Sequence, residues 1–124
     1  MNPRVRVAIV DDESPVRTAL GRLLRLAHYE VSLFPSGEAF LESLETQTPD
    51  CVVLDINMPG MSGLDVQRRL RSVSLDIPAI CITSGDDVSL TRGVLDAGAV
   101  ELLRKPFSNR EFLEAIRVAL DTND

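Results

Sequence analysis

Short apolar runs alternate along the chain with segments of mixed polarity. The runs cover residues 5–10, 30–34, 51–54, 79–82 and 100–103. Apolar runs of four to six residues, bounded by polar residues, are typical of β-strands. Every position in 51–54 and 79–82 is apolar, which is expected of strands that are buried on both faces of a sheet. The pattern therefore predicts five strands, of which two are central.

The segments between these runs show the apolar spacing of amphipathic helices. One stripe consists of Val16, Ala19, Leu20, Leu23 and Ala27, and another of Phe112, Ala115, Ile116, Ala119 and Leu120. Helix starts are marked by Ser14 before Pro15, by Ser36, and by a predicted capping box of Ser108 and Glu111. Each predicted strand is thus followed by a predicted helix.

Strands that alternate with helices form βαβ units, whose right-handed crossovers place parallel strands in one sheet with helices on both faces. The sequence therefore predicts an α/β fold with a doubly wound five-stranded parallel sheet. A chain of 124 residues is long enough for one hydrophobic core. We expect a single domain over residues 1–124, with the polar tail 121–124 as a frayed end or the start of a linker.

The charge and cysteine content narrow the possible functions. A formal net charge of −6 disfavours direct binding to nucleic acid. No apolar run approaches the length of a membrane span, and no signal-peptide core follows the start, so we expect a cytoplasmic protein without membrane contact. Cys51 and Cys81 lie in apolar runs and are expected to be core thiols rather than a disulfide. With His28 as the single histidine, they argue against a zinc site.

Polar residues with complementary chemistry follow four of the predicted strands. These residues are Asp11, Asp12 and Glu13 after the first strand, Asp55 after the third, Thr83 and Ser84 after the fourth, and Lys105 after the fifth. The carboxyl ends of parallel strands meet at one edge of a sheet, where such folds bind their ligands. Carboxylates gathered there would repel one another unless a cation or protons compensate, and hard oxygen ligands suit Mg²⁺. A metal ion and an ammonium group are what a transferring phosphoryl group needs, which makes Asp55, nearest the sheet centre, the predicted nucleophile.

Each of these residues also has an ordinary structural explanation. Asp11 to Glu13 could be favourable charges before a helix, and Asp55 could be a turn residue. Thr83 could cap a helix, and Lys105 could be a solvated surface charge. The functional interpretation depends on the set as a whole, because separate strand ends supply the complementary groups.

Four stretches of the chain, at their spacings, resemble a known family. They are Val7-Ala-Ile-Val-Asp-Asp12, Val53-Leu-Asp55-Ile-Asn-Met-Pro59-Gly-Met-Ser-Gly63, Ile82-Thr83-Ser84, and Gly98-Ala99 leading to Lys105-Pro106-Phe107. Over essentially its whole length the chain resembles the receiver domain of bacterial two-component response regulators. The resemblance implies a flavodoxin-like (βα)5 fold with strand order 2-1-3-4-5. It also implies that a sensor histidine kinase phosphorylates Asp55.

The resemblance further implies a Mg²⁺ site. Asp12 would bind the ion directly and Asp11 largely through water. Asp55 and the main-chain carbonyl of Asn57 would complete the protein ligands.

Around the phosphoryl group, the resemblance implies that Lys105 pairs with its oxygens and that the Thr83 hydroxyl moves to donate to one of them. The Lys105–Pro106 peptide bond is expected to be cis. Receivers usually carry tyrosine or phenylalanine three residues before the lysine, where this chain has Leu102. This departure leaves phosphorylation intact and puts the aromatic part of the family's switch in doubt.

The amino-acid sequence around the motifs is similar to receivers of the FixJ-like group, which typically precede a LuxR-type DNA-binding output domain. The similar stretches are Phe34-Pro-Ser-Gly-Glu38, Met58-Pro-Gly-Met-Ser-Gly-Leu64 and Ala99-Val-Glu-Leu-Leu-Arg-Lys-Pro-Phe107. The chain is therefore either a stand-alone receiver or part of a longer regulator. Phosphorylation is expected to change the surface of the fourth helix, fifth strand and fifth helix, which would form a homodimer or bind an output partner. The candidate members of that surface, each of which could instead be an ordinary core residue, are Val88, Leu90, Val94, Leu102, Arg104 and Phe107.

Three other function classes fit the residues less well. A flavodoxin-type redox module needs a Ser/Thr/Gly-rich loop for the FMN phosphate, which Asp11 and Asp12 would repel. A hydrolytic phosphotransferase with an Asp-x-Asp motif lacks its second acid, because Asn57 stands there. A degenerate receiver that only binds partners would lack a site residue, and none is missing. We expect no enzyme activity beyond self-catalysed phosphoryl acceptance and autodephosphorylation.

Overall fold

The computed structural model describes residues 4–85 and 88–121. Its five strands are β1 (Arg6–Val10), β2 (Glu30–Phe34), β3 (Cys51–Asp55), β4 (Ala79–Thr83) and β5 (Glu101–Arg104). The helices are α1 (Ser14–Leu26), α2 (Gly37–Ser43), α3 (Gly63–Ser72), α4 (Val88–Asp96) and α5 (Asn109–Asp121). All strand pairs are parallel, in the order β2-β1-β3-β4-β5, which confirms the predicted fold class and strand order.

The central strands are longer than the apolar pattern alone predicts. β3 runs on to Asp55, whose Cα pairs with that of Ile82, and β4 runs on to Thr83, which pairs with Arg104. Two other strands begin one residue later than predicted, since β1 begins at Arg6 and β5 begins at Glu101. Two predicted site residues are therefore the last residues of central strands, where the ladder fixes their position.

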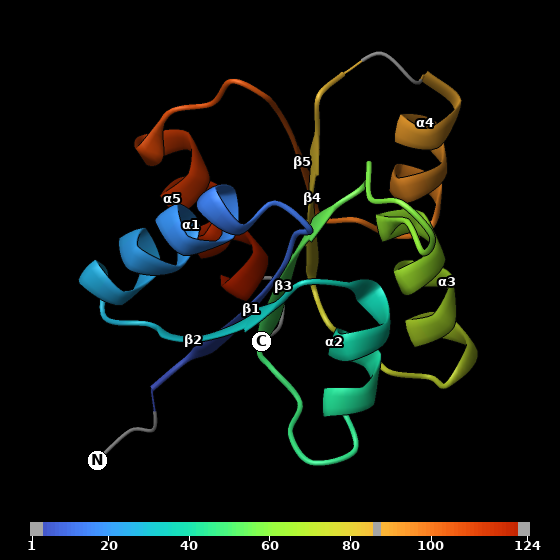
Figure 1. Cartoon of the computed structure of the whole chain (residues 1–124), viewed down its shortest axis with the longest axis horizontal. Helices are drawn as coiled ribbons and strands as arrows, with labels where there is room; N and C mark the ends of the chain where they lie inside the picture. Colours follow the sequence, from blue (N-terminus) through green and yellow to red (C-terminus); the bar gives the residue numbers. More distant parts are fainter. Residues whose placement is uncertain (1–3, 86–87, 122–124) are drawn as a thin grey trace.

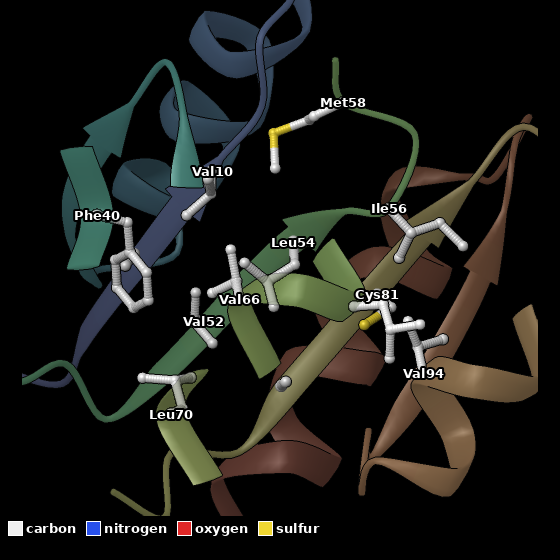
Figure 2. Packing of buried hydrophobic residues seen from close by; sticks show 13 residues of the cluster. Val10, Phe40, Val52, Leu54, Ile56, Met58, Val66, Leu70, Cys81 and Val94 are labelled. Atoms are coloured by element: carbon white, nitrogen blue, oxygen red, sulfur yellow. The ribbon is translucent and has the colours of Figure 1, made fainter. Parts of the chain in front are cut away.

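Helices cover the sheet on both faces, with α1 and α5 on one side and α2, α3 and α4 on the other (Figure 1). Successive strand residues face opposite layers. In β3, Val52 and Leu54 belong to the cluster under α2, α3 and α4, which Figure 2 shows from close by. Cys51 and Val53 belong to the second cluster, under α1 and α5. One strand thus supplies both halves of the core.

Two of the predicted helix starts are confirmed by side-chain caps. The Ser36 hydroxyl accepts a hydrogen bond from the Ala39 amide at 3.1 Å. Ser108 and Glu111 form the predicted capping box, with Ser108 Oγ accepting from the Glu111 amide at 3.0 Å and the Glu111 carboxylate accepting from the Ser108 amide at 3.2 Å. Main-chain amides in the first turns of α2 and α5, which have no partner within the helix, are therefore satisfied by these side chains.

The helix start expected at Ser14 is different. Ser14 is the first residue of α1, and the N-cap residue is Glu13, whose side chain makes no capping hydrogen bond. The Glu13 amide instead donates to the Asp11 carboxylate at 2.8 Å. The turn before α1 is closed by a residue of the candidate site, so a serine cap is not needed there.

The predicted apolar stripe of α1 is confirmed in part, because Val16, Leu20 and Leu23 are buried or packed against the cluster under α1 and α5. Ala19 is exposed, whereas Leu24, which lies outside that stripe, is fully buried beside Leu20.

In α5 the predicted stripe is confirmed, because its members are buried or packed against the same cluster. The α5 helix also includes Asp121, whose carboxylate accepts from Arg117 at 2.8 Å. Asp121 is therefore the last helical residue although the tail was expected to begin there, and residues 122–124 lie outside the described part of the chain.

Val94, a candidate member of the output surface, is fully buried and is a core residue, in the cluster that also contains Leu64 of α3. The two helices pack closely, since a Cβ placed on Gly93 would lie 2.8 Å from Cδ2 of Leu64. Val88, at the start of α4, is exposed as expected. Within the described residues, no helix is both long enough and apolar enough to cross a membrane.

Both cysteines are free and buried, as predicted, and they belong to opposite layers of the core. Burial raises the pKa of the Cys51 and Cys81 thiols to about 12. The Cys81 thiol lies 3.6 Å from the Oε1 oxygen of Gln67, to which it donates. Both side chains therefore act as neutral core residues.

Replacing Leu54 with alanine should lower the free energy of unfolding by about 2–5 kcal/mol, because the fully buried side chain would leave a cavity. Urea unfolding followed by circular dichroism measures the change. The matched control is Leu26→Ala in α1, where the leucine is 73% exposed, and a change within about 0.5 kcal/mol is expected. Equal effects of the two substitutions would contradict the described core.

Candidate functional site

Three carboxylates gather at the carboxyl edge of the sheet. Asp11 directly follows β1, and Asp55 ends the neighbouring strand β3. An oxygen from each of Asp11, Asp12 and Asp55 lies within 4.8 Å of the others. Asp11 and Asp55 are only 1% and 4% exposed, whereas Asp12 is exposed. The structure thus brings together the three acidic residues that the sequence placed in one site.

Hydrogen bonds from main-chain amides hold one oxygen of each buried carboxylate. Oδ1 of Asp11 accepts from the Glu13 amide at 2.8 Å, and Oδ1 of Asp55 accepts from the Asn57 amide at 2.9 Å. Oδ2 of Asp11 is buried and has no hydrogen-bond partner among residues 4–85 and 88–121. A buried acceptor without a partner is costly, so this oxygen is a position where an added cation or donor would be stabilising.

The acidic cluster perturbs its own ionisation. The pKa of Asp11 is raised to about 6, mainly by burial and also by the charge of the nearby Asp55, against the lowering effects of the Glu13 amide and Lys105. Burial also raises the pKa of Asp55, while the Asn57 amide and Lys105 lower it. Oxygen donors that lack a compensating charge suit a hard divalent cation. The donor set therefore fits the kind of metal ion that the sequence predicts.

The last residue of β4 lies beside this cluster and is tied to the loop after β3. Asn57 Oδ1 accepts from the Ser84 amide at 3.2 Å and lies 3.4 Å from the hydroxyl oxygens of both Thr83 and Ser84. Thr83 Oγ1 in turn accepts from the Gly85 amide at 2.9 Å. The Thr83 hydroxyl thus bonds the loop after β4, and α4 is described from Val88 onward.

Lys105 follows β5, and its amide donates to the carbonyl of Thr83 at 2.8 Å. The Lys105–Pro106 peptide bond is cis, as the family resemblance predicted. The ammonium nitrogen of Lys105 lies 3.7 Å from Oε1 of Glu13, and both side chains are partly exposed. This ion pair is long and solvent-accessible, so it leaves the lysine able to exchange partners.

Sequence reasoning missed several contacts around the site. It did not predict that Glu13 pairs with Lys105, or that Asn57 binds Ser84. It also did not place Arg17, whose guanidinium donates to the main-chain oxygen of Asp11 at 2.6 Å. The residue types gave no signal for these contacts, because each depends on side-chain conformations that converge from separate loops.

The chain matches the response regulator receiver domain family over residues 7–117. The chain belongs to this family. It is 42% identical over 116 residues to the response regulator MprA of Mycolicibacterium vanbaalenii, covering 94% of this chain and 50% of MprA. It is 40% identical over 114 residues to the response regulator protein TodT of Pseudomonas putida, covering 92% of this chain and 50% of TodT.

Among solved structures, FixJ-N superposes with a TM-score of 0.89 at 37% identity, covering 98% of this receiver domain and 96% of that chain. The response regulator StyR superposes with a TM-score of 0.85 at 40% identity, covering 98% of this chain and 61% of StyR. The chain spans about half the length of the curated relatives that it matches. The predicted family is confirmed, and with it the role of a receiver domain in two-component signalling.

Replacing Asp11 with asparagine should stabilise the metal-free protein at pH 7 by roughly 1–3 kcal/mol, because the folded state no longer holds a buried charge. The pKa of Asp11 rises from 3.8 to about 6 on folding, so between these values the folded state holds a proton that the unfolded chain has released. Wild-type stability should therefore fall as pH rises through this window. Asparagine has no charge to lose and should remove that fall.

Urea unfolding between pH 4 and 8 in a chelator measures the difference, which should be small near pH 4 and largest above pH 6. The matched control is Asp76→Asn, which replaces an exposed aspartate. Parallel stability profiles for the wild type and Asp11→Asn would contradict the electrostatic description of the cluster.

Proposed function

We propose that this receiver domain accepts a phosphoryl group from a sensor histidine kinase onto Asp55. The observation that carries the proposal is the placement of Asp55 at the end of the central strand β3, with Asp11, Asp12 and Lys105 around it. One of its oxygens is held by the Asn57 amide. This arrangement supplies a nucleophile together with the positive and polar groups that phosphoryl transfer requires.

In the proposed reaction, a carboxylate oxygen of Asp55 attacks the phosphorus of a phosphohistidine on the kinase. The new P–O bond forms as the P–N bond breaks, and the bonding electron pair remains on the imidazole nitrogen. The product is an acyl phosphate on Asp55. The reaction requires an ionised carboxylate, so the positive charge of Lys105 favours the reactive form against the effect of burial.

Mg²⁺ is the proposed cofactor, held by the carboxylates of Asp11, Asp12 and Asp55 and by the main-chain carbonyl of Asn57. The unpartnered Oδ2 of Asp11 and the all-oxygen donor set support this assignment. When bound, the ion would neutralise charge on the transferring phosphoryl oxygens. Deprotonation of the acidic residues favours its binding, so its affinity is expected to fall at acidic pH.

Lys105 and Thr83 are proposed to bind the phosphoryl oxygens of the product. The ammonium group of Lys105 is held by one long, partly exposed ion pair. The Thr83 hydroxyl accepts from the Gly85 amide at 2.9 Å, and its donor contact with Asn57 is weak, at 3.4 Å. Small rearrangements would therefore bring both donors to the modified Asp55.

The proposed output surface consists of α4, β5 and α5, and it would form a homodimer or bind an output partner. Val88 at 73% and Leu95 at 48% exposure are apolar side chains of α4 available for such a contact. Leu102 packs against the core cluster under α4 and could carry the change without the usual aromatic ring. Because relatives are about twice as long, we also propose that this domain controls an attached output domain, of which the LuxR type is one candidate.

Incubation with acetyl phosphate and Mg²⁺ should add one phosphoryl group to the protein, because the site itself supplies the catalytic groups. Intact-mass spectrometry measures the gain. The gain should be lost in Asp55→Asn, which keeps the size of the side chain but removes the nucleophile, and also when Mg²⁺ is removed.

Asp76→Asn provides the control for a generic loss of negative charge and should be phosphorylated like the wild type. The proposal fails if the folded wild-type protein gains no mass under any of these conditions. It also fails if Asp55→Asn gains the group to the same extent as the wild type.

A further inference from the structure

The side chain of Asn57 links the loops that follow β3 and β4. Its Oδ1 oxygen accepts from the Ser84 amide at 3.2 Å and lies 3.4 Å from the Thr83 hydroxyl and from the Ser84 hydroxyl. Three donors from the end of β4 therefore point at one oxygen atom. That oxygen lies two residues after Asp55, and the Asn57 amide is itself bonded to the Asp55 carboxylate at 2.9 Å.

We infer that the Asn57 carboxamide oxygen is an internal stand-in for a phosphoryl oxygen in the resting domain. It engages the Thr83 hydroxyl and the Ser84 amide, which are the neutral donors nearest to the end of β4. A phosphoryl group on Asp55 would offer an oxygen to the same donors, so the two acceptors compete. This inference rests on the proposed phosphorylation of Asp55.

The geometry of the link suits reversible competition. Oxygen-to-oxygen distances of 3.4 Å are long for hydroxyl donors, and a carbonyl oxygen has two lone pairs for the three donors around it. The link is also near solvent, because Asn57 and Ser84 are both exposed. A phosphoryl oxygen carries negative charge and is a stronger acceptor than a neutral amide. Exchange of the donors from Asn57 to the phosphoryl group is therefore favourable.

Release of this link would also move the loop after β4. The Thr83 hydroxyl accepts from the Gly85 amide at 2.9 Å, so displacement of the hydroxyl displaces the loop. Gly85 has a positive φ of 113°, and a Cβ placed on it would lie 3.6 Å from the side chain of Arg104. Asn57 would thus restrain the loop after β4, which connects the region of Asp55 with Arg104 of β5.

Asn57→Leu and Asn57→Ala test the inference. Both keep the main-chain amide and carbonyl of residue 57, and leucine also keeps the bulk of the side chain. With Mg²⁺ present, both variants should bind beryllium fluoride, a stable phosphoryl analogue, roughly three- to tenfold more tightly than the wild type, because about one weak hydrogen bond no longer competes. Isothermal titration calorimetry measures the affinity, and thermal unfolding verifies the fold of each variant.

A second readout needs neither Mg²⁺ nor a phosphoryl analogue. In the resting protein, the amide proton signal of Ser84 should shift upfield in both variants, because the amide loses its acceptor, whereas the Glu13 amide signal should not move. Ser84→Ala keeps that amide and is expected to retain the signal near its wild-type position. Nuclear magnetic resonance of the ¹⁵N-labelled protein measures these shifts.

The outcomes separate the inference from the proposed function. Unchanged or weaker beryllium fluoride binding in both variants overturns the stand-in role, and tighter binding in Asn57→Ala alone assigns the effect to bulk and also overturns it. If the wild type neither gains a phosphoryl group nor binds the analogue, the proposed function fails by itself. A Ser84 signal that is insensitive to both substitutions overturns the resting link whether or not phosphorylation occurs.

Discussion

Repulsion between carboxylates at one edge of the sheet is the constraint on which the rest of the site depends. The parallel register of β1 and β3 leaves Asp11 and Asp55 side by side with almost no contact with water. The fold does not relieve this repulsion by separating the two residues. It surrounds them with main-chain amides and one lysine, which satisfy only part of the negative charge. The cluster consequently suits a divalent cation, whose charge would also offset that of an incoming anionic group.

The groups around these carboxylates are connected across loops in a way that residue types could not predict. Asn57 bonds Ser84 across two strand ends, and Glu13 pairs with Lys105 across two others. The sequence predicted which residues reach this edge, because the ends of neighbouring parallel strands must meet there. It could not predict which side chains bond in the resting state, since those bonds depend on rotamers and on the turn taken by each loop.

The same division applies to the fold. The parallel sheet and both central strands follow from alternation and from fully apolar runs, which are properties of the chain itself. The strand order was predicted only through the resemblance to receiver domains. Apolar spacing alone placed Ala19 in the core of α1 and left out Leu24. Two neighbouring rows of residues along a helix fit the same i, i+3, i+4 spacing, so the spacing does not distinguish them. Val94 shows a second weakness: its burial in the cluster that contains Leu64 of α3 involves packing between helices that neither segment reveals alone.

The two cysteines have a practical consequence for studying this domain. Both thiols are enclosed in the core, and at neutral pH almost none of either is in the thiolate form that reacts with labelling reagents. The chain contains no other cysteine. A single cysteine introduced on an exposed face of α4 would therefore be the one reactive thiol of the folded protein. Spectroscopic probes could be attached there without first removing the native cysteines and disturbing either layer of the core.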